Sequence, residues 1–284
     1  MTPKAILLHL RLPFSLFLMP VYWFSLSQTR DFDVSKAAWI FVIWHLLVYP
    51  ASNAYNSYFD KDAGSIGGLE KPPAVDKELF YTAWVMDILA VVISLIWVNY
   101  VFAAAVLVYG LVSKSYSHTL IRLKKYPFLS WLIVGFFQGA FVYISTQQAI
   151  SPVPLPVSGS LLPALLSSMM LWAVYPMTQI YQHEEDAKRG DRTLSLLLGI
   201  RGTFLFTASI YSLAAVGFGY YLPYRHFLFF IMLTAPTLVF FLNWFRKTWL
   251  DESQANFKNT MRLNLLASIG LNVLFITLFL LNHY

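Results

Sequence analysis

Two short segments of the sequence place amides and a carboxylate at the spacing of successive helical turns. Asn53, Asn56 and Asp60 are separated by three and four residues, so they lie on one face of a helix. The same pattern returns 126 residues later in the chain. Its members there are Gln179, Gln182 and Asp186. Amide and carboxylate oxygens are the ligands that hard cations such as Mg²⁺ prefer, so the pattern predicts a cation site.

The two segments form an internal repeat. Residues 49–64 read YPASNAYNSYFDKDAG, and residues 175–190 read YPMTQIYQHEEDAKRG. Five aligned positions are identical, namely Tyr49 with Tyr175, Pro50 with Pro176, Tyr55 with Tyr181, Asp60 with Asp186, and Gly64 with Gly190. Three more pair conservatively, namely Ser52 with Thr178, Asn53 with Gln179, and Asn56 with Gln182. Polar side chains also hold membrane helices together, but two matching stripes that each end in Asp favour a site over that reading.

Basic side chains flank the predicted cation ligands. Arg122 and Lys124 lie in one connecting segment, and Lys188, Arg189 and Arg192 lie in another. Magnesium keeps several waters and is typically held by one or two carboxylates together with substrate phosphates. Acids beside Lys and Arg therefore indicate a diphosphate site rather than a site for a bare cation. The sequence has no Cys, which excludes disulfides, thiolate zinc sites and cysteine nucleophiles.

The elements that position these residues are membrane helices. Apolar residues make up 58% of the chain and charged residues 12%, about half the usual share for a soluble domain. With a mean hydropathy of +0.58, this composition excludes a soluble globule, a disordered chain and a nucleic-acid-binding domain. The predicted spans are residues 5–27, 37–58, 80–98, 101–114, 129–149, 160–181, 203–222, 226–245 and 262–282.

The distribution of Lys and Arg predicts the topology. With nine spans and a cytoplasmic N-terminus, 17 of the 20 basic residues fall on the cytoplasmic side, the exceptions being Arg30, Lys36 and Arg225. Lys114 is counted here as a residue of the cytoplasmic loop after the fourth span. The C-terminus is then external, and we expect a multi-pass protein of the cell membrane. The first run holds Arg11 and lacks a small-residue cleavage site, so we expect it to remain as a helix.

The expected fold is an all-α polytopic membrane bundle of nine transmembrane helices. The repeat offset covers four spans, so both copies cross the membrane in the same direction and form a parallel internal repeat. We expect a single domain over residues 1–284, with repeat halves of about 1–125 and 126–245 and a ninth helix at 262–282. Asp87 lies inside a span, where we favour a structural hydrogen-bond partner over a site residue.

Three segments carry a resemblance to a known family. Residues 56–60, NSYFD, are similar to the motif N-D-x-x-D-x-x-x-D. Tyr116–Ser117 with Arg122–Leu123–Lys124 is similar to Y-S-x-x-x-x-R-L-K, and residues 186–193, DAKRGDRT, are similar to a second Asp motif with its trailing G-x-[KR]-[ST]. On these segments the chain resembles the UbiA superfamily of intramembrane prenyltransferases, which have nine transmembrane helices and Asp-rich motifs after helices 2 and 6.

The resemblance implies a Mg²⁺-dependent transferase that moves an isoprenoid chain from its diphosphate to a hydrophobic, often aromatic, acceptor in membrane lipid. The implied metal and diphosphate ligands are Asn56, Asp60 and Asp186, and the implied phosphate donors are Arg122, Lys124 and Lys188. Ser57, Gly64 and Gln182 stand where the family has acids. Nearby acids supply carboxylates in their place, namely Asp62, Glu184 and Glu185, and we include Glu185 among the predicted metal ligands.

Ionisation of an allylic diphosphate also needs an apolar cavity with aromatic faces that stabilise the carbocation. Tyr55 and Tyr181, inside the repeat, are the predicted aromatics, and Tyr116 or His118 is predicted to assist the acceptor or to have a capping role. Asn53, Gln179 and Gln182 complete the predicted substrate-binding set. Two other classes remain open, a non-catalytic isoprenoid-diphosphate or lipid-binding protein and a transporter. Phenolic acid, naphthoate, porphyrin and glycerol phosphate are all open as acceptors.

Overall fold

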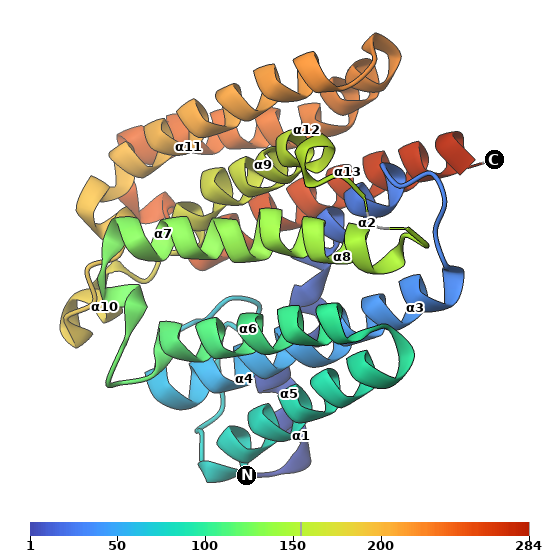
Figure 1. Ribbon diagram of the computed structural model, residues 1–284. Helices are drawn as coiled ribbons and strands as arrows, with labels where there is room; N and C mark the ends of the chain where they lie inside the picture. The colour runs from blue at the N-terminus through green and yellow to red at the C-terminus, as the bar shows by residue number, and fades with distance from the viewer. Residues whose placement is uncertain (154, 284) are drawn as a thin grey trace. The chain divides into compact units, whose positions relative to one another are not determined.

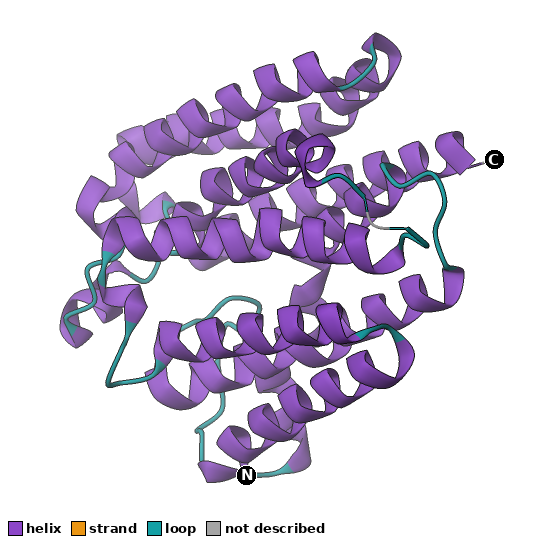
Figure 2. Ribbon diagram, in the orientation of Figure 1, coloured by secondary structure: helices purple, strands orange, loops and turns teal. Residues whose placement is uncertain are grey.

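The computed structural model describes residues 1–153 and 155–283, and the regular elements in this part of the chain are helices (Figures 1 and 2). The α-helices are α1 Pro3–Leu10, α2 Met19–Ser27, α3 Val34–Val42, α4 Tyr49–Asp60, α5 Lys77–Trp97, α6 Tyr100–Ser117, α7 Pro127–Gly135, α8 Val142–Ile150, α9 Val157–Val174, α10 His183–Arg189, α11 Leu194–Tyr221, α12 Tyr224–Leu250 and α13 Phe257–His283. Short 3₁₀ turns are η1 Leu12–Phe17, η3 Leu123–Lys125, η5 Tyr175–Thr178 and η6 Glu252–Gln254, and π turns are η2 Ile43–Val48 and η4 Phe136–Phe141.

The described residues contain eight helices that are long and apolar enough to cross a membrane. A further pair, Pro3–Phe17 and Met19–Ser27, is bent by 41° and raises the number of spans to nine if it crosses as one. The bend lies at the break between Phe17 and Met19, where Pro20 in the first turn of α2 cannot donate a backbone hydrogen bond. Arg11, with φ 49° in the left-handed region, ends α1 earlier in the same segment. The prediction of an all-helical polytopic membrane protein is therefore confirmed, with nine as the approximate number of spans.

The span that carries the first Asp motif is continuous from Val34 to Asp60 but contains the π turn η2. Pro50 follows this turn after one residue, Tyr49. Proline has no N–H, and its ring clashes with the carbonyl four residues earlier, so it disturbs the hydrogen-bond ladder of a regular helix. The wider π turn accommodates this residue without ending the helix. The span therefore reaches Asp60 as its last helical residue.

The chain divides into two compact units that interleave along the sequence. The first unit comprises residues 1–16, 31–124 and 145–155, and in it α4 packs on α5 and α5 packs on α6. Its core cluster consists of Leu10, Ala54, Tyr55, Leu79 and Ala83. The division of a single domain into repeat halves at about residue 125 stays a prediction.

The second unit comprises residues 17–30, 125–144 and 156–284. In it α9 packs on α11 and on η4, and α13 packs on α2 and α12. Its core cluster consists of Met177, Ile180, Phe204, Phe241, Trp244 and Leu263. Aromatic packing dominates this core, with the Phe204 ring 4.9 Å from that of Trp244 and 5.0 Å from that of Phe245.

The contact between α9 and η4 depends on Gly139. A Cβ at this position would lie 2.5 Å from the Ser168 Cα, so the two backbones can approach only because the side chain is hydrogen. Gly139→Ala should lower the free energy of unfolding by about 1–3 kcal/mol, as overpacking does. Denaturant unfolding in mixed micelles measures this, with Gly159→Ala as the matched control because nothing lies within 4 Å of a Cβ there. Equal stability of the two variants would contradict the close approach.

Candidate functional site

In the first unit, the Asp60 carboxylate at the end of α4 is enclosed by donors. Its Oδ1 lies 2.5 Å from the Lys124 Nζ and 3.8 Å from the Arg122 Nη2, and its Oδ2 accepts a hydrogen bond of 2.8 Å from the Asn56 Nδ2. The Asp60 side chain is only 4% exposed. Charge-assisted hydrogen bonds to a buried group are short and strong, so the Asp60 carboxylate is held firmly by two cations and an amide.

The turn after α6 brings the two basic residues back to Asp60. The helix ends at Ser117, and the Arg122 backbone N–H donates to the His118 carbonyl at 2.7 Å. Arg122 has φ 46°, a left-handed conformation that is unfavourable for a long side chain and persists only where surrounding contacts enforce it. The following 3₁₀ turn, Leu123–Lys125, then places Lys124 at the carboxylate. The structure thus brings this segment to the Asp60 carboxylate.

The two amides of the first stripe differ in their partners. The Asn56 Nδ2 donates to Asp60 and also to the Ser117 Oγ at 2.9 Å, which links α4 to the end of α6. The Asn53 Nδ2 donates instead to the Leu10 carbonyl at 3.3 Å, while the Arg11 guanidinium donates to the Asn53 carbonyl at 3.1 Å. Asn56 therefore belongs to the carboxylate network, and Asn53 joins α4 to the end of α1.

In the second unit, Asp186 occupies the equivalent position in α10. Its Oδ1 pairs with the Arg189 Nη2 at 2.8 Å, and its Oδ2 accepts from the Thr193 Oγ1 at 3.3 Å. Gly190 ends the helix in the left-handed region with φ 74°, and the Asp191 N–H then donates to the Asp186 carbonyl at 2.9 Å. This turn folds Thr193 back onto the carboxylate, so a second buried Asp is also held by a cation and a neutral donor.

The prediction of one helical stripe in the second copy is wrong. The turn η5 ends at Thr178, and α10 begins at His183, so Gln179 and Gln182 are not on the helix that carries Asp186. Three acids occupy the first turn of α10, where the positive end of the helix dipole favours negative charge and a new helix start. The Gln179 Oε1 instead accepts from the Ser195 N–H at 3.3 Å, and Gln182 lies at the N-cap position of α10.

The other predicted residues have varied surroundings. Tyr55 is 2% exposed, and the Lys114 Nζ lies 4.9 Å from the centre of its ring. The Tyr181 ring contacts that of Phe257 edge-on at 5.4 Å. Half-buried side chains are Tyr116, in the last turn of α6, and Glu185, in the first turn of α10, whereas Lys188 is exposed. The roles of these residues stay predictions.

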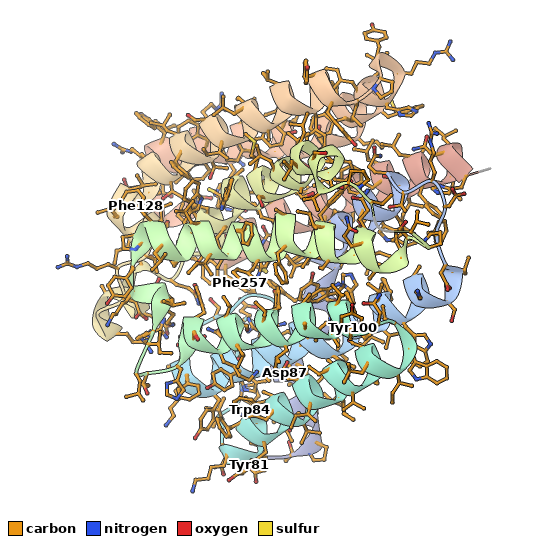
Figure 3. The ribbon with its side chains drawn as sticks, viewed as in Figure 1. Tyr81, Trp84, Asp87, Tyr100, Phe128 and Phe257 are labelled. Carbon is orange, nitrogen blue, oxygen red and sulfur yellow. The ribbon has the colours of Figure 1, made fainter. Side chains whose placement is uncertain are left out.

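Lys114 does not lie in a cytoplasmic loop, and that assignment is corrected. It is buried in α6, which runs on to Ser117, and its ammonium forms an ion pair with the Asp87 carboxylate of α5. The Trp84 ring, one turn from Asp87, lies 4.8 Å from the Lys114 Nζ (Figure 3 labels both α5 residues). Asp87 is therefore a structural ion-pair partner, as favoured from the sequence.

His183 lies next to the acids of α10 but is engaged elsewhere. Its Nε2 is 2.7 Å from the Ser195 Oγ, which is itself 3.0 Å from the Thr203 Oγ1. Burial lowers the pKa of His183, and the negative charge of Glu252 opposes that shift. The neutral imidazole is thus favoured at pH 7, and the ring acts as a hydrogen-bond partner that fixes the start of α11.

The donor set can be tested against a magnesium ion. Among the described residues, no group of three or more His, Asp or Glu side chains forms a metal cage. Each unit instead offers one buried Asp, already neutralised by a basic side chain. Magnesium usually takes one or two carboxylates and completes its shell with water and substrate phosphates. The residues therefore suit a Mg²⁺–diphosphate complex rather than an ion bound by protein alone.

Comparison with known proteins decides the family. The model of the UbiA prenyltransferase family matches residues 17–266, which is most of the chain. The chain belongs to the UbiA prenyltransferase family. No curated protein matches this UbiA family member.

Solved structures of UbiA proteins share its fold. A UbiA homolog from Archaeoglobus fulgidus bound to DMAPP and Mg²⁺ has 15% identity and a TM-score of 0.70 and covers 98% of each chain. An apo UbiA homolog from Aeropyrum pernix K1 has 17% identity and a TM-score of 0.67, covering 93% of this chain and 97% of its own. A structure of digeranylgeranylglyceryl phosphate synthase has 18% identity and a TM-score of 0.59 over 98% of this chain and 97% of its own.

Thr193 and Arg189 were not predicted as partners of Asp186, and Ser117 was not predicted as a partner of Asn56. A signal for Thr193 was present, since the segment GDRT follows the second Asp motif. Glycine at a helix C-terminus commonly reverses the chain, so residues just beyond it return to the last turn. Ser117 had no comparable signal, because its contact with α4 depends on how two helices pack.

Proposed function

We propose that this UbiA family member is an intramembrane prenyltransferase that moves an isoprenoid chain from its diphosphate to a hydrophobic acceptor. The observation that carries the proposal is the buried Asp60 carboxylate held by Lys124, Arg122 and Asn56. Lys and Arg lie within 4 Å of this carboxylate. The carboxylate can bind the metal ion of a metal-bound diphosphate, and the two basic side chains can neutralise its phosphate oxygens. UbiA homologs of the same fold were solved with DMAPP or GPP and Mg²⁺, which supports the choice of donor.

Asp60 and Asp186 are the proposed magnesium ligands, one from each unit, with Asn56 and Glu185 as further oxygen donors. Their repeat equivalence supports this, because the two residues are aligned in the repeat and both are buried beside a basic side chain. When bound, Mg²⁺ stabilises the negative charge that develops on the leaving diphosphate. An acceptor of aromatic character is part of the same proposal and follows from the family resemblance alone.

The protein's own residues bind and orient the diphosphate. When Asp60 turns from its ion pairs to the cation, Lys124 and Arg122 become free to donate to phosphate oxygens. Lys188 is exposed and is proposed as a further donor, whereas Arg189 pairs with Asp186 and Asp191. Tyr55 and Tyr181 are the proposed aromatic neighbours of the developing allylic cation, and Tyr116 is the proposed residue beside the acceptor. Asn53, Gln179 and Gln182 keep a proposed substrate-binding role.

The direct test is transfer by membranes that contain the full chain. Radiolabelled isoprenoid diphosphates of five to twenty carbons are incubated with Mg²⁺ and a panel of phenolic, naphthoic, porphyrin and glycerol phosphate acceptors. Labelled product that requires both Mg²⁺ and one acceptor class supports the proposal. Tight Mg²⁺-dependent donor binding without any product would favour the alternative, a non-catalytic isoprenoid-diphosphate binding protein. Movement of label across the membrane without product would favour a transporter.

The proposed orientation places the N-terminus in the cytoplasm, the C-terminus outside and both Asp motifs on the cytoplasmic side. The distribution of basic residues still supports it without Lys114, because 16 of the 20 basic residues remain assigned by sequence to the cytoplasmic side. Reporter fusions within residues 61–76 are expected to report a cytoplasmic location. An external signal from that loop would overturn the orientation.

Gln182→Asp should lower the magnesium concentration needed for half-maximal donor binding. Gln182 stands where the family motif begins with an acid, and an added carboxylate near the first turn of α10 strengthens a hard-cation site. We expect a shift of several-fold, measured by binding of a non-hydrolysable isoprenoid diphosphate analogue over a magnesium titration. Ser158→Asp, at an exposed position in the first turn of α9, is the control for adding negative charge alone. An unchanged titration for Gln182→Asp would place position 182 outside the metal shell.

A further inference from the structure

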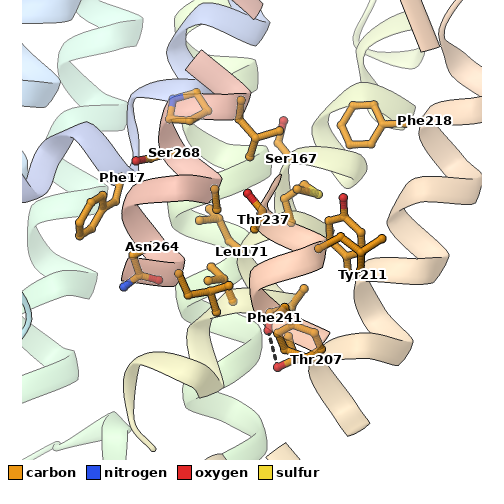
Figure 4. Close-up of a pocket in the computed structure, with 18 of the residues that line it drawn as sticks. Phe17, Ser167, Leu171, Thr207, Tyr211, Phe218, Thr237, Phe241, Asn264 and Ser268 are labelled. Carbon is orange, nitrogen blue, oxygen red and sulfur yellow. Dashed lines mark hydrogen bonds between the residues drawn. The ribbon is translucent and has the colours of Figure 1, made fainter. Parts of the chain in front are cut away.

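The second unit contains a cavity of about 250 Å³ that is separate from its buried Asp186. It lies between α2, α9, α11, α12 and α13 (Figure 4). Its walls are mainly apolar and aromatic side chains, among them Phe24, Leu171, Phe218, Phe241 and Phe275. Neither an acidic nor a basic side chain of the described chain lines it, so the cavity suits a neutral molecule.

Three hydroxyl side chains at the cavity wall donate to carbonyls. The Thr207 Oγ1 donates to the Ala173 carbonyl at 2.9 Å, the Ser167 Oγ donates to the Pro163 carbonyl at 3.0 Å, and the Ser268 Oγ donates to the Leu265 carbonyl at 3.1 Å. Such bonds to the same or a neighbouring helix satisfy a hydroxyl within a membrane protein. These three residues therefore leave no donor for a ligand.

Asn264 of α13 is different. It is 5% exposed and lines the cavity, and its Nδ2 has no hydrogen-bond partner in the described part of the chain. The Thr237 Oγ1 of α12, also at the cavity wall, has no partner there either. A buried polar group without a partner is unfavourable, more so where the surroundings are hydrocarbon rather than water. The structure thus places an unpaired amide donor at the wall of a mainly apolar cavity.

We propose that this cavity binds a neutral lipophilic molecule through a carbonyl oxygen that accepts a hydrogen bond from the Asn264 Nδ2. A pure hydrocarbon fills the space but leaves the amide donor unpaired, whereas a carbonyl satisfies it. An engineered apolar cavity of about 150 Å³ holds one benzene, so 250 Å³ has room for a two-ring molecule or a short chain. The site is independent of the proposed transfer reaction, because it uses none of the residues placed at the diphosphate.

The test compares ligands matched in shape on the purified full chain in lipid nanodiscs. The probes are 1-tetralone, with one ring carbonyl, and tetralin, the same two-ring skeleton without it. Methyl octanoate and decane form a second pair, which separates a ring ketone from a lipid-type ester as the source of the carbonyl. Binding is measured by the rise in Tm over a ligand titration, and membrane partitioning is corrected with nanodiscs lacking the protein.

The wild type is expected to bind the carbonyl member of at least one pair at least fivefold more tightly than its hydrocarbon partner. Asn264→Leu keeps the size of the side chain and removes the donor, so its preference should disappear while hydrocarbon binding remains. This variant should fold at least as well as the wild type, because it removes an unpaired polar group. Ala267→Phe, one turn along α13, should reduce binding of every probe by filling the cavity.

Equal binding of carbonyl and hydrocarbon probes by the wild type would overturn the proposal. So would a carbonyl preference that persists in Asn264→Leu, or one that persists in a folded Ala267→Phe variant, because the preference would then arise elsewhere. None of these outcomes depends on prenyl transfer, so failure of the proposed transferase activity leaves this test intact.

Discussion

Asp60→Asn is expected to reduce prenyl transfer by a factor of about 10²–10³, the usual effect of removing one preorganised group that stabilises developing charge. The substitution keeps the size of the side chain and removes the anion that we propose as a magnesium ligand. It also leaves the Lys124 and Arg122 charges, 2.5 Å and 3.8 Å from the Asp60 Oδ1, without their carboxylate. Transfer is measured in membranes with labelled donor, and Mg²⁺-dependent donor binding is measured separately.

Asp186→Asn is expected to have a comparable effect, because Asp186 is the repeat equivalent of Asp60. If both carboxylates serve one Mg²⁺–diphosphate complex, the double variant should be little worse than either single variant, since groups that act as a unit are not additive. Asp33→Asn is the matched control. Asp33 is an exposed N-cap of α3 that accepts from the Lys36 N–H at 3.0 Å, and Asn caps a helix equally well.

Two results would contradict this assignment. Asp60→Asn with the activity of Asp33→Asn would remove Asp60 from the site. Donor binding by the wild type that is unchanged in excess chelator would show that Lys and Arg alone hold the phosphates, and the magnesium assignment would then fail. Circular dichroism of each purified variant checks that lost transfer is not lost folding.

The spans were predictable because a membrane helix needs a long apolar run, and such a run can be recognised whatever the helix packs against. Asp60 and Lys124 were both identified in motifs with fixed spacing, but the contact between them was not predicted. The second motif was harder. Its residues Tyr175, Pro176 and Tyr181 are identical to those of the first repeat copy, which indicated one continuous helix. The helix is instead interrupted before His183. The acids at 184–186 carried the contrary signal, because they favour a helix start.

Contacts that depend on helix packing had weaker signals in the sequence. Lys114 lies near the predicted end of a span, and helix ends are uncertain by several residues, so it was assigned to a loop. Whether it faces Asp87 depends on the register between α5 and α6, which a turn of only two residues joins. Gly110 lies beside Asp87, but a Cβ there would be 3.7 Å from the carboxylate carbon, an ordinary contact, so this glycine does not mark the pairing either.

Asp87→Leu is expected to lower the free energy of unfolding by about 3–5 kcal/mol, because it leaves the buried Lys114 ammonium without its counter-charge. The Lys114 side chain is 7% exposed, so the ammonium has little access to water. The rings of Tyr55 and Trp84, 4.9 Å and 4.8 Å from the Nζ, recover part of the lost interaction but do not replace a carboxylate. Unfolding in mixed micelles, followed by circular dichroism, measures the change.

Asp87→Leu combined with Lys114→Met should restore stability to within about 1 kcal/mol of the wild type, since replacing both members of a buried ion pair by apolar groups is often neutral or stabilising. The half-exposed pair of Arg201 and Glu252, 3.5 Å apart, is the matched control. Glu252→Gln should change stability by at most about 1 kcal/mol, because water screens that pair. A double variant as unstable as Asp87→Leu alone would show that the carboxylate stabilises α5 and α6 through something other than Lys114.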